Sequence, residues 1–205
     1  MPGLTLTTEA FVIERRPPSD AFQTLGLFSA EHGNLLALQR IPKKPSATHV
    51  TPDLFDEISV SLDSSNQGRT WFIREARIVT RRASIGRSYD SLRFASALAS
   101  VIRRNPVHEE SRAGVGRLLR TAFDAFGSAA RPDVVYLKSL YLFARDEGYP
   151  VKQEWLPSLP ASDRAVATEA LGRRLGEQES AGADVERIRR SLEDYLGSHT
   201  EIIVK

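Results

Sequence analysis

Arginine is the residue type whose spacing suggests chemistry in this chain. Between Arg69 and Arg87 the sequence contains six arginines and a single acidic residue, Glu75. Cations gathered on one surface bind phosphate groups and release their counterions. Exposed aromatic rings beside them stack on nucleobases, which contributes about 1–3 kcal/mol per base. We therefore expect a DNA-binding surface made of Arg15, Arg16, Arg40, Lys43, Lys44, Arg74, Arg77, Arg81 and Arg82, with Phe22, Trp71 or Phe72 as the stacking aromatic.

A second interpretation of the same residues is purely structural. The arginines would be solvated surface charges paired with Glu14, Asp56 and Glu57, and the aromatic side chains would fill the interior. Exposed ion pairs of this kind contribute little to stability and imply no ligand. The formal net charge of the whole chain is only +2, so bulk electrostatics does not decide between the two interpretations.

Patterns for catalysis or metal binding are missing from the sequence. Cysteine is absent, which excludes disulfides, thiol chemistry and cysteine-ligated zinc. The four histidines are far apart, and no glycine-rich phosphate loop occurs. Asp56 and Glu57 are adjacent on an expected strand, so they would point to opposite faces; we interpret them as a solvated strand edge rather than an acid–base pair. We expect a protein that is not an enzyme and needs no cofactor or metal.

Length and hydropathy bound the remaining possibilities. The chain has 205 residues, enough for one large or two small domains. No apolar run approaches the roughly 20 residues that span a bilayer, and no charged start followed by an apolar block marks a leader. We expect a cytoplasmic protein that does not associate with membranes.

The first 83 residues indicate five short strands. Apolar runs alternate with turn residues such as Pro17, Pro18 and Gly33. The pattern is clearest where Ile58 and Val60 alternate with serines at period two. Short, evenly spaced strands without a long helix between them are typical of an OB-type barrel, and an SH3-like barrel has the same periodicity. The expected strands cover residues 9–13, 22–28, 35–38, 54–62 and 71–79.

After Gly86 the apolar residues recur at i, i+3 and i+4, which predicts helices. One of them would begin near Pro132, where a first-turn proline is tolerated, and end at Gly148. Two more are expected over residues 162–176 and 184–196, with Asp184 as the N-cap of the second.

The fold class that follows is α+β, with the strands first and the helices after them. A five-stranded OB-type barrel would occupy residues 1–83 and an α-helical domain residues 88–205. Residues 202–204 are too apolar for a free tail, so we expect them to dock as an extended segment.

Several segments of the chain occur in the order and spacing of a known family. A strand over residues 9–13, a strand ending in Leu27-Phe28, the Glu31-His32-Gly33 turn and a basic loop follow one another near the N-terminus. Residues 71–79, 140–149 and 192–197 extend the likeness along most of the chain. Together they resemble RecO, the family of bacterial recombination mediators.

The resemblance implies a non-catalytic, nucleoid-associated protein that binds single- and double-stranded DNA and anneals complementary strands. With RecR and single-stranded DNA-binding protein it would help to load RecA. Many RecO-like proteins carry a four-cysteine zinc module after the helix that ends in Gly-Tyr, whereas residues 150–155 here read Pro-Val-Lys-Gln-Glu-Trp. We therefore expect the zinc module to be missing or replaced.

The resemblance also implies a pocket on the helical domain for the acidic C-terminal tail of single-stranded DNA-binding protein. Cations in this pocket would bind the carboxylates of the tail, and an apolar slot would bind its terminal Phe. Tyr141 lies on an apolar helical stripe, which is equally the pattern of a core residue. The candidate residues are Lys138, Tyr141, Arg145, Arg103 and Arg104.

A different function is also compatible with the sequence. The protein would be a non-catalytic interaction scaffold whose barrel has lost its affinity for DNA. The near-neutral net charge and the departures from the family pattern in residues 150–180 motivate this alternative.

Overall fold

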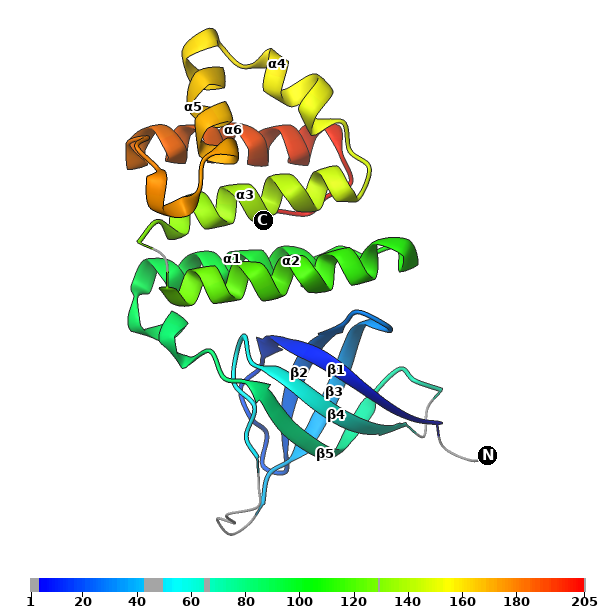
Figure 1. The fold of residues 1–205 in the computed structure, drawn as a ribbon. Coiled ribbons are helices and arrows are strands. Elements are labelled where there is room, and N and C mark those ends of the chain that lie inside the picture. The colour runs from blue at the N-terminus through cyan, green and yellow to red at the C-terminus, as the bar shows by residue number, and fades with distance from the viewer. Residues whose placement is uncertain (1–3, 43–49, 65–66, 129, 205) are drawn as a thin grey trace. The chain divides into compact units, whose positions relative to one another are not determined.

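The computed structural model describes residues 4–42, 50–64, 67–128 and 130–204 of the chain. Five strands come first and helices follow them (Figure 1), so the predicted order of strands and helices is confirmed. The chain divides into two compact units. Unit 1 comprises Met1–Arg82 and Pro106–Gly116, and unit 2 comprises Ala83–Asn105 and Arg117–Lys205.

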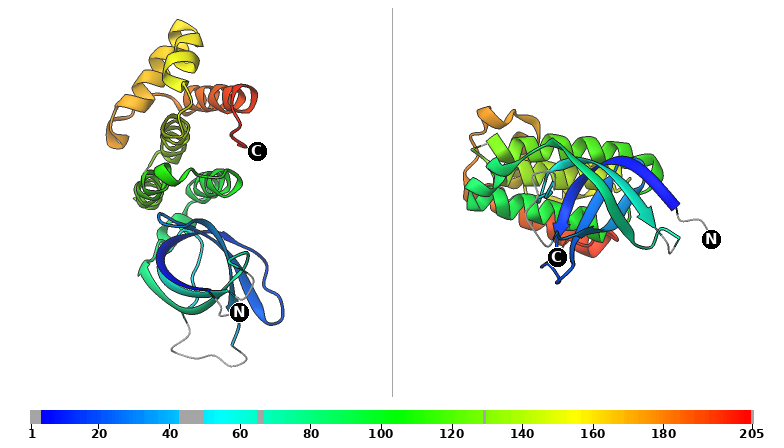
Figure 2. Two further views of the ribbon diagram at one scale, coloured as in Figure 1. Left: turned by 90° about the vertical axis from the view of Figure 1, so that its right-hand side faces the viewer. Right: turned by 90° about the horizontal axis from the view of Figure 1, so that it is seen from below.

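Unit 1 is built on a closed barrel with the strand order β1-β2-β3-β5-β4. The left-hand view of Figure 2 shows the strands forming a ring. Neighbouring strands are antiparallel except β3 and β5, which are parallel. Apolar side chains such as Leu25, Ile58 and Leu62 are fully buried and fill the interior. The strands are β1 (Leu4–Arg15), β2 (Phe22–Ser29), β3 (Gly33–Arg40), β4 (Glu57–Ser64) and β5 (Trp71–Thr80).

The strand predicted over residues 54–62 begins three residues later, at Glu57. Phe55 adopts a φ of 69°, which interrupts an extended strand, and the Asp56 N–H donates to the carbonyl oxygen of Asp53 in a turn. The apolar residues before the strand therefore belong to a tight turn. Because Leu54 and Phe55 are apolar, the sequence pattern placed the start of this strand three residues too early.

A β-bulge brings β1 and β2 unusually close together. Val12 pairs with Leu27 and Glu14 pairs with Gly26, so Ile13 is an extra residue in β1. A Cβ atom on Gly26 would lie only 2.8 Å from the Cβ of Glu14. The close approach of the two strands thus requires glycine at this position.

The start of α2 (Glu109–Ser128) belongs to unit 1, where it packs on the turn between β2 and β3. Gly33 has a φ of 71°, the left-handed conformation that the predicted turn requires. Arg112 of α2 lies against this glycine and donates from Nη1 to the carbonyl oxygen of Glu31 at 3.2 Å. A Cβ on Gly116 would lie 3.2 Å from the Cβ of Ala30, so the helix also approaches the turn through a small residue.

Unit 2 is helical, and α3 is its central element. This helix contacts α1, α5 and α6. Its buried side chains lie on more than one face, because Val135, Tyr136 and Phe143 are buried in addition to the apolar stripe of Val134, Leu137, Leu140, Tyr141 and Ala144. The helices are α1 (Tyr89–Arg104), α2 (Glu109–Ser128), α3 (Pro132–Asp146), α4 (Leu156–Ser158), α5 (Ala161–Gly172) and α6 (Gly182–His199), with short helical turns at Ala83–Arg87, Val151–Trp155 and Leu175–Glu177.

Helix boundaries in unit 2 differ from the predicted ones by a few residues. The helix expected over residues 162–176 is α5 followed by the separate turn Leu175–Glu177. Asp184 is not the N-cap of α6, because Ala181 occupies that position and Asp184 lies in the first turn. The predicted docking of the C-terminus is confirmed for Ile202, which is buried. The next residue, Ile203, exchanges two hydrogen bonds through its backbone with the side chain of Asn105.

Candidate nucleic-acid interface

A groove opens on the barrel where β3 and β5 separate. The two strands pair only at Ala37 with Trp71 and at Leu38 with Phe72, and then diverge. The space between them has a volume of about 430 Å³. We call it the β3–β5 groove; its lining residues are Gln39, Arg40, Val50, Ile73, Arg74, Glu75, Ala76 and Arg77.

A second β-bulge shapes the β5 side of this groove. Leu62 of β4 pairs with Ile73 and Ser61 pairs with Glu75, so Arg74 is an extra residue in β5. The bulge breaks the alternation of the strand, and both Arg74 and Glu75 are exposed. Two neighbouring charged side chains therefore line the groove together.

Three guanidinium groups of the groove have weak or no partners among the described residues. The side chains of Arg40 and Arg77 are exposed, and their guanidinium groups make no ion pair or hydrogen bond with that part of the chain. The nearest carboxylate oxygen to Arg74 is that of Asp63, at 3.9 Å, and both side chains are exposed. Such a pair contributes about 0–1 kcal/mol at most. These three cations are thus available to a phosphate group.

The other described cations of the predicted surface are engaged in ion pairs. Arg15 lies 3.4 Å from Asp53 and Arg16 lies 3.1 Å from Glu14. These pairs match the structural interpretation of the sequence, in which carboxylates neutralise the arginines. Lys43 and Lys44 lie outside the described residues.

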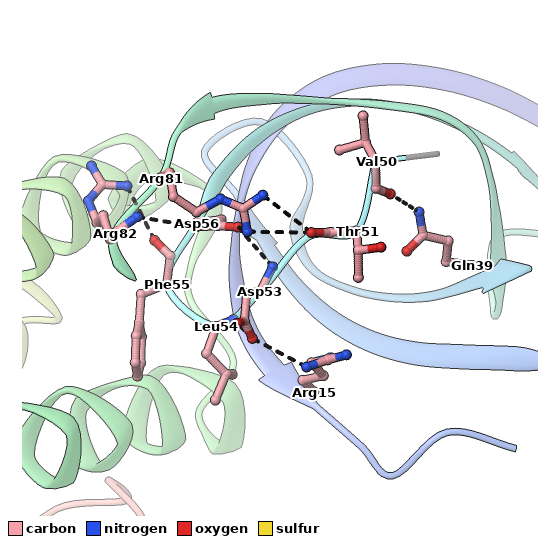
Figure 3. A network of polar contacts seen from close by, with 10 residues as sticks. All are labelled: Arg15, Gln39, Val50, Thr51, Asp53, Leu54, Phe55, Asp56, Arg81 and Arg82. Atoms are coloured by element: carbon pink, nitrogen blue, oxygen red, sulfur yellow. Dashed lines mark hydrogen bonds and ion pairs between the residues drawn. The ribbon is translucent and has the colours of Figure 1, made fainter. Parts of the chain in front are cut away.

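Arg81 and Arg82 stabilise the barrel rather than extend the groove (Figure 3). Arg81 lies 2.9 Å from the carboxylate of Asp56 and donates to the carbonyl oxygen of Thr51. Arg82 is buried, where it pairs with Glu57 at 3.4 Å and donates to the carbonyl oxygen of Phe55. The buried guanidinium of Arg82 has no access to a ligand.

Asp56 and Glu57 are not a solvated strand edge, and that interpretation of the sequence was wrong. Their exposed fractions are 1% and 3%. Besides its ion pair, the Asp56 carboxylate accepts hydrogen bonds from the backbone N–H groups of Asp53 at 2.8 Å and Arg82 at 3.3 Å. The carboxylate thereby ties the segment before β4 to the end of β5.

A neighbouring hydrogen bond fixes one wall of the groove. Nε2 of Gln39 donates to the carbonyl oxygen of Val50 at 2.6 Å (Figure 3). Gln39 is nearly buried in β3, so this bond holds Val50 against the strand. Neither residue is charged or belongs to a motif, so this contact could not be predicted from the sequence.

Of the three candidate stacking residues, Phe72 is the most exposed. Its exposed fraction is 40%, and its ring meets that of Phe22 edge to face with centroids 5.9 Å apart. Trp71 is buried in the barrel core. Phe72 precedes the groove residue Ile73 in β5, and an exposed aromatic ring is a group on which a nucleobase can stack.

The residues predicted to bind an acidic peptide are mostly engaged within unit 2. The ammonium group of Lys138 donates to the carbonyl oxygen of Arg173, and burial lowers the pKa of Lys138. Tyr141 has an exposed fraction of 8%, and its ring packs on that of Trp155 with centroids 6.1 Å apart. Arg145 lies 2.6 Å from Asp146. Tyr141 is thus a core residue, which was the alternative to a place in the peptide-binding pocket.

Unit 2 does contain a recess, but its chemistry is acidic. It has a volume of about 560 Å³ and includes Glu147 and Glu201. Arg103 and Arg104 lie in the last turn of α1 and do not line it. Two carboxylates repel an acidic peptide, so this recess is a poor match for the predicted tail. Its lining residues are Glu147, Gly148, Tyr149, Ser198, His199, Thr200 and Glu201.

Two further properties concern the described part of the chain. None of its His, Asp and Glu side chains gather in a group of three or more that would hold a metal ion. None of its helices combines the length and apolarity needed to cross a membrane.

Comparison with known proteins adds no family assignment. No protein-family model matches the sequence. The curated proteins contain no match to it either. We therefore infer function from the geometry of the barrel and from the residues that line the β3–β5 groove.

Proposed function

We propose that this protein binds DNA in the β3–β5 groove without catalysing a reaction. One observation carries the proposal: Arg40, Arg74 and Arg77 line one groove and lack a strong anionic partner among the described residues. Guanidinium groups pair with phosphates through two parallel hydrogen bonds, and each phosphate contact releases counterions. Binding of this kind tolerates any sequence, because the phosphate backbone is the same at every step.

The exposed ring of Phe72 favours single-stranded DNA as one substrate. In a duplex the bases are stacked on each other, whereas in a single strand they are free to stack on an aromatic side chain. Phe72 and the groove arginines belong to the same strand, β5, or to the adjacent end of β3. A bound strand would thus place its phosphates on the arginines and a base on Phe72.

We extend the proposal to a RecO-like recombination mediator. The order of a five-stranded barrel followed by helices is compatible with this assignment, and the resemblance of the sequence segments supports it. The mechanism needs no catalytic side chain, because phosphate contacts that hold two strands close together raise their effective concentration. Recruitment of single-stranded DNA-binding protein and of RecR belongs to the same proposal and is supported by the resemblance alone.

A non-catalytic interaction scaffold is the second candidate. The observation in its favour is that Arg15, Arg16, Arg81 and Arg82 are all paired with carboxylates. If the groove arginines also failed to bind phosphate, the barrel would be a neutral platform for another protein.

Annealing of two complementary fluorescent oligonucleotides separates these functions. A mediator binds the labelled single strand and accelerates duplex formation. Binding without acceleration would restrict the function to DNA binding. Absence of both binding and acceleration would contradict the proposal and favour the scaffold.

A further inference from the structure

Glu75 is an unexpected side chain in a groove for phosphates. It is the one acidic residue among those that line the β3–β5 groove. It is exposed, and its carboxylate makes no ion pair or hydrogen bond within the described chain, although Arg74 and Arg77 are close to it in β5. A carboxylate repels phosphate, so this residue lowers the affinity of the groove for the DNA backbone.

A carboxylate without a partner has a specific chemical capacity. It offers two acceptor oxygens and no donor, so it binds a pair of adjacent N–H groups. Nucleobases in a single strand expose their Watson–Crick edges, where they are read by hydrogen bonds. Base edges are therefore the groups in DNA that Glu75 is suited to bind.

The four bases differ in what they present to two acceptors. Guanine has N1–H and N2–H groups side by side, which match both oxygens of a carboxylate. Thymine has one N–H between two carbonyl oxygens, and these oxygens repel a carboxylate. Adenine and cytosine each place an amino group next to an unprotonated ring nitrogen, so only one hydrogen bond forms.

We propose that Glu75 makes the β3–β5 groove select guanine in single-stranded DNA. This inference rests on the proposed DNA-binding function and adds base selectivity to it. The bulge at Arg74 places Glu75 beside an arginine that binds the phosphate. Phe72 precedes both in the same strand and supplies a ring for stacking. Phosphate, base face and base edge are then each bound by a different side chain.

The test compares the affinities of fluorescent 15-residue oligonucleotides by anisotropy at constant salt. One contains only thymine, and the others carry three separated guanines, inosines or adenines, spaced so that no quadruplex forms. We expect the wild-type protein to bind the guanine oligonucleotide at least about 5-fold more tightly than the thymine one, the lower end for a good bidentate contact. Inosine lacks the N2 amino group, so it should lose most of this preference.

The variant E75Q gives a sharper readout than loss of binding. Its amide offers an N–H donor and a carbonyl acceptor side by side, and every base presents a matching acceptor and donor on its Watson–Crick edge. We therefore expect E75Q to lose the preference for guanine. Because Glu75 is exposed, the thermal unfolding midpoint should stay close to the wild-type value.

Three results would overturn the inference. Equal affinity of the wild-type protein for the thymine and guanine oligonucleotides would refute guanine selection and leave the DNA-binding proposal intact. A guanine preference that persists in E75Q would show that a residue other than Glu75 is responsible for it. Absence of binding to every oligonucleotide would refute the proposed function, and this inference with it.

Discussion

The guanidinium of Arg82 lies 3.4 Å from the carboxylate of Glu57, and both side chains are only 4% exposed. The centroid of the Phe11 ring lies 5.6 Å from Cζ of the same guanidinium. Charged groups that are removed from water need a partner of opposite charge. Here Arg82 and Glu57 are each other's partner. An arginine from the basic cluster is thus buried and paired within the protein, so it does not belong to a surface that could bind DNA.

Removing the charge of Glu57 should destabilise the protein strongly. In the variant E57Q the guanidinium of Arg82 stays buried without its carboxylate, and breaking a buried pair costs about 3–5 kcal/mol. Urea unfolding measures this loss. The matched control is E14Q, which removes a carboxylate from the exposed pair with Arg16 and should cost less than about 1 kcal/mol. Equal losses in the two variants would refute the structural role of the buried pair.

Substitution of Gly26 by alanine tests the close approach of β1 and β2. The new Cβ would lie 2.8 Å from the Cβ of Glu14, so the strands must shift. We expect a loss of about 1–3 kcal/mol in the free energy of unfolding. Gly86 is the control, because a Cβ there meets no atom within 4 Å and G86A should change stability by less than about 0.5 kcal/mol. If G26A unfolds at the wild-type urea concentration, the bulge is more tolerant than this geometry implies.

Alkaline pH should destabilise the protein through Tyr136. Burial raises the pKa of Tyr136 above its ordinary value of 10.0, and the negative charge of Glu193 acts in the same direction. Below pH 10 the phenol is protonated in both the folded and the unfolded protein, so Tyr136 does not make the free energy of unfolding depend on pH. Above pH 10 the unfolded chain ionises first, so the free energy of unfolding falls by up to about 1.4 kcal/mol per pH unit.

Urea unfolding between pH 9 and pH 11.5 measures this dependence. The variant Y136F removes the titrating group, so its stability should fall less steeply with pH than that of the wild-type protein. The variant Y89F serves as a control, because Tyr89 is 79% exposed. Identical slopes for Y136F and the wild-type protein would assign the alkaline loss to other groups.

The strands were predictable because their residues alternate with the period of a half-buried sheet. Ile58, Val60 and Leu62 all point into the barrel, as the pattern predicted. The start of β4 was not predictable, because apolar Leu54 and Phe55 belong to a turn. The Asp56 carboxylate stabilises this turn by accepting a local hydrogen bond from Asp53 and a long-range one from Arg82. Sequence periodicity reports burial and cannot distinguish a buried turn from a buried strand.

The sequence located the arginine cluster but not which of its members reach solvent. Arg81 and Arg82 are adjacent in the chain, yet Arg82 is buried and Arg81 is half exposed. Their partners lie about 25 residues away in the sequence, so their pairing depends on tertiary structure. The groove itself depends on the divergence of β3 and β5, which pair over only two positions. A parallel pairing this short leaves no periodic signal.

The salt dependence of DNA binding tests the groove most directly. The variant R40Q/R74Q/R77Q removes three cations from the groove, and the control R15Q/R16Q/R93Q removes three that are paired with Asp53, Glu14 and Asp90. Each phosphate contact on a single strand contributes about 0.7 to the slope of log affinity against log salt concentration. We predict that the groove variant binds a single-stranded oligonucleotide more weakly, with a slope flatter by about 2, and that the control keeps the wild-type slope. Equal slopes for the two variants would contradict the assignment of the β3–β5 groove as the DNA-binding site.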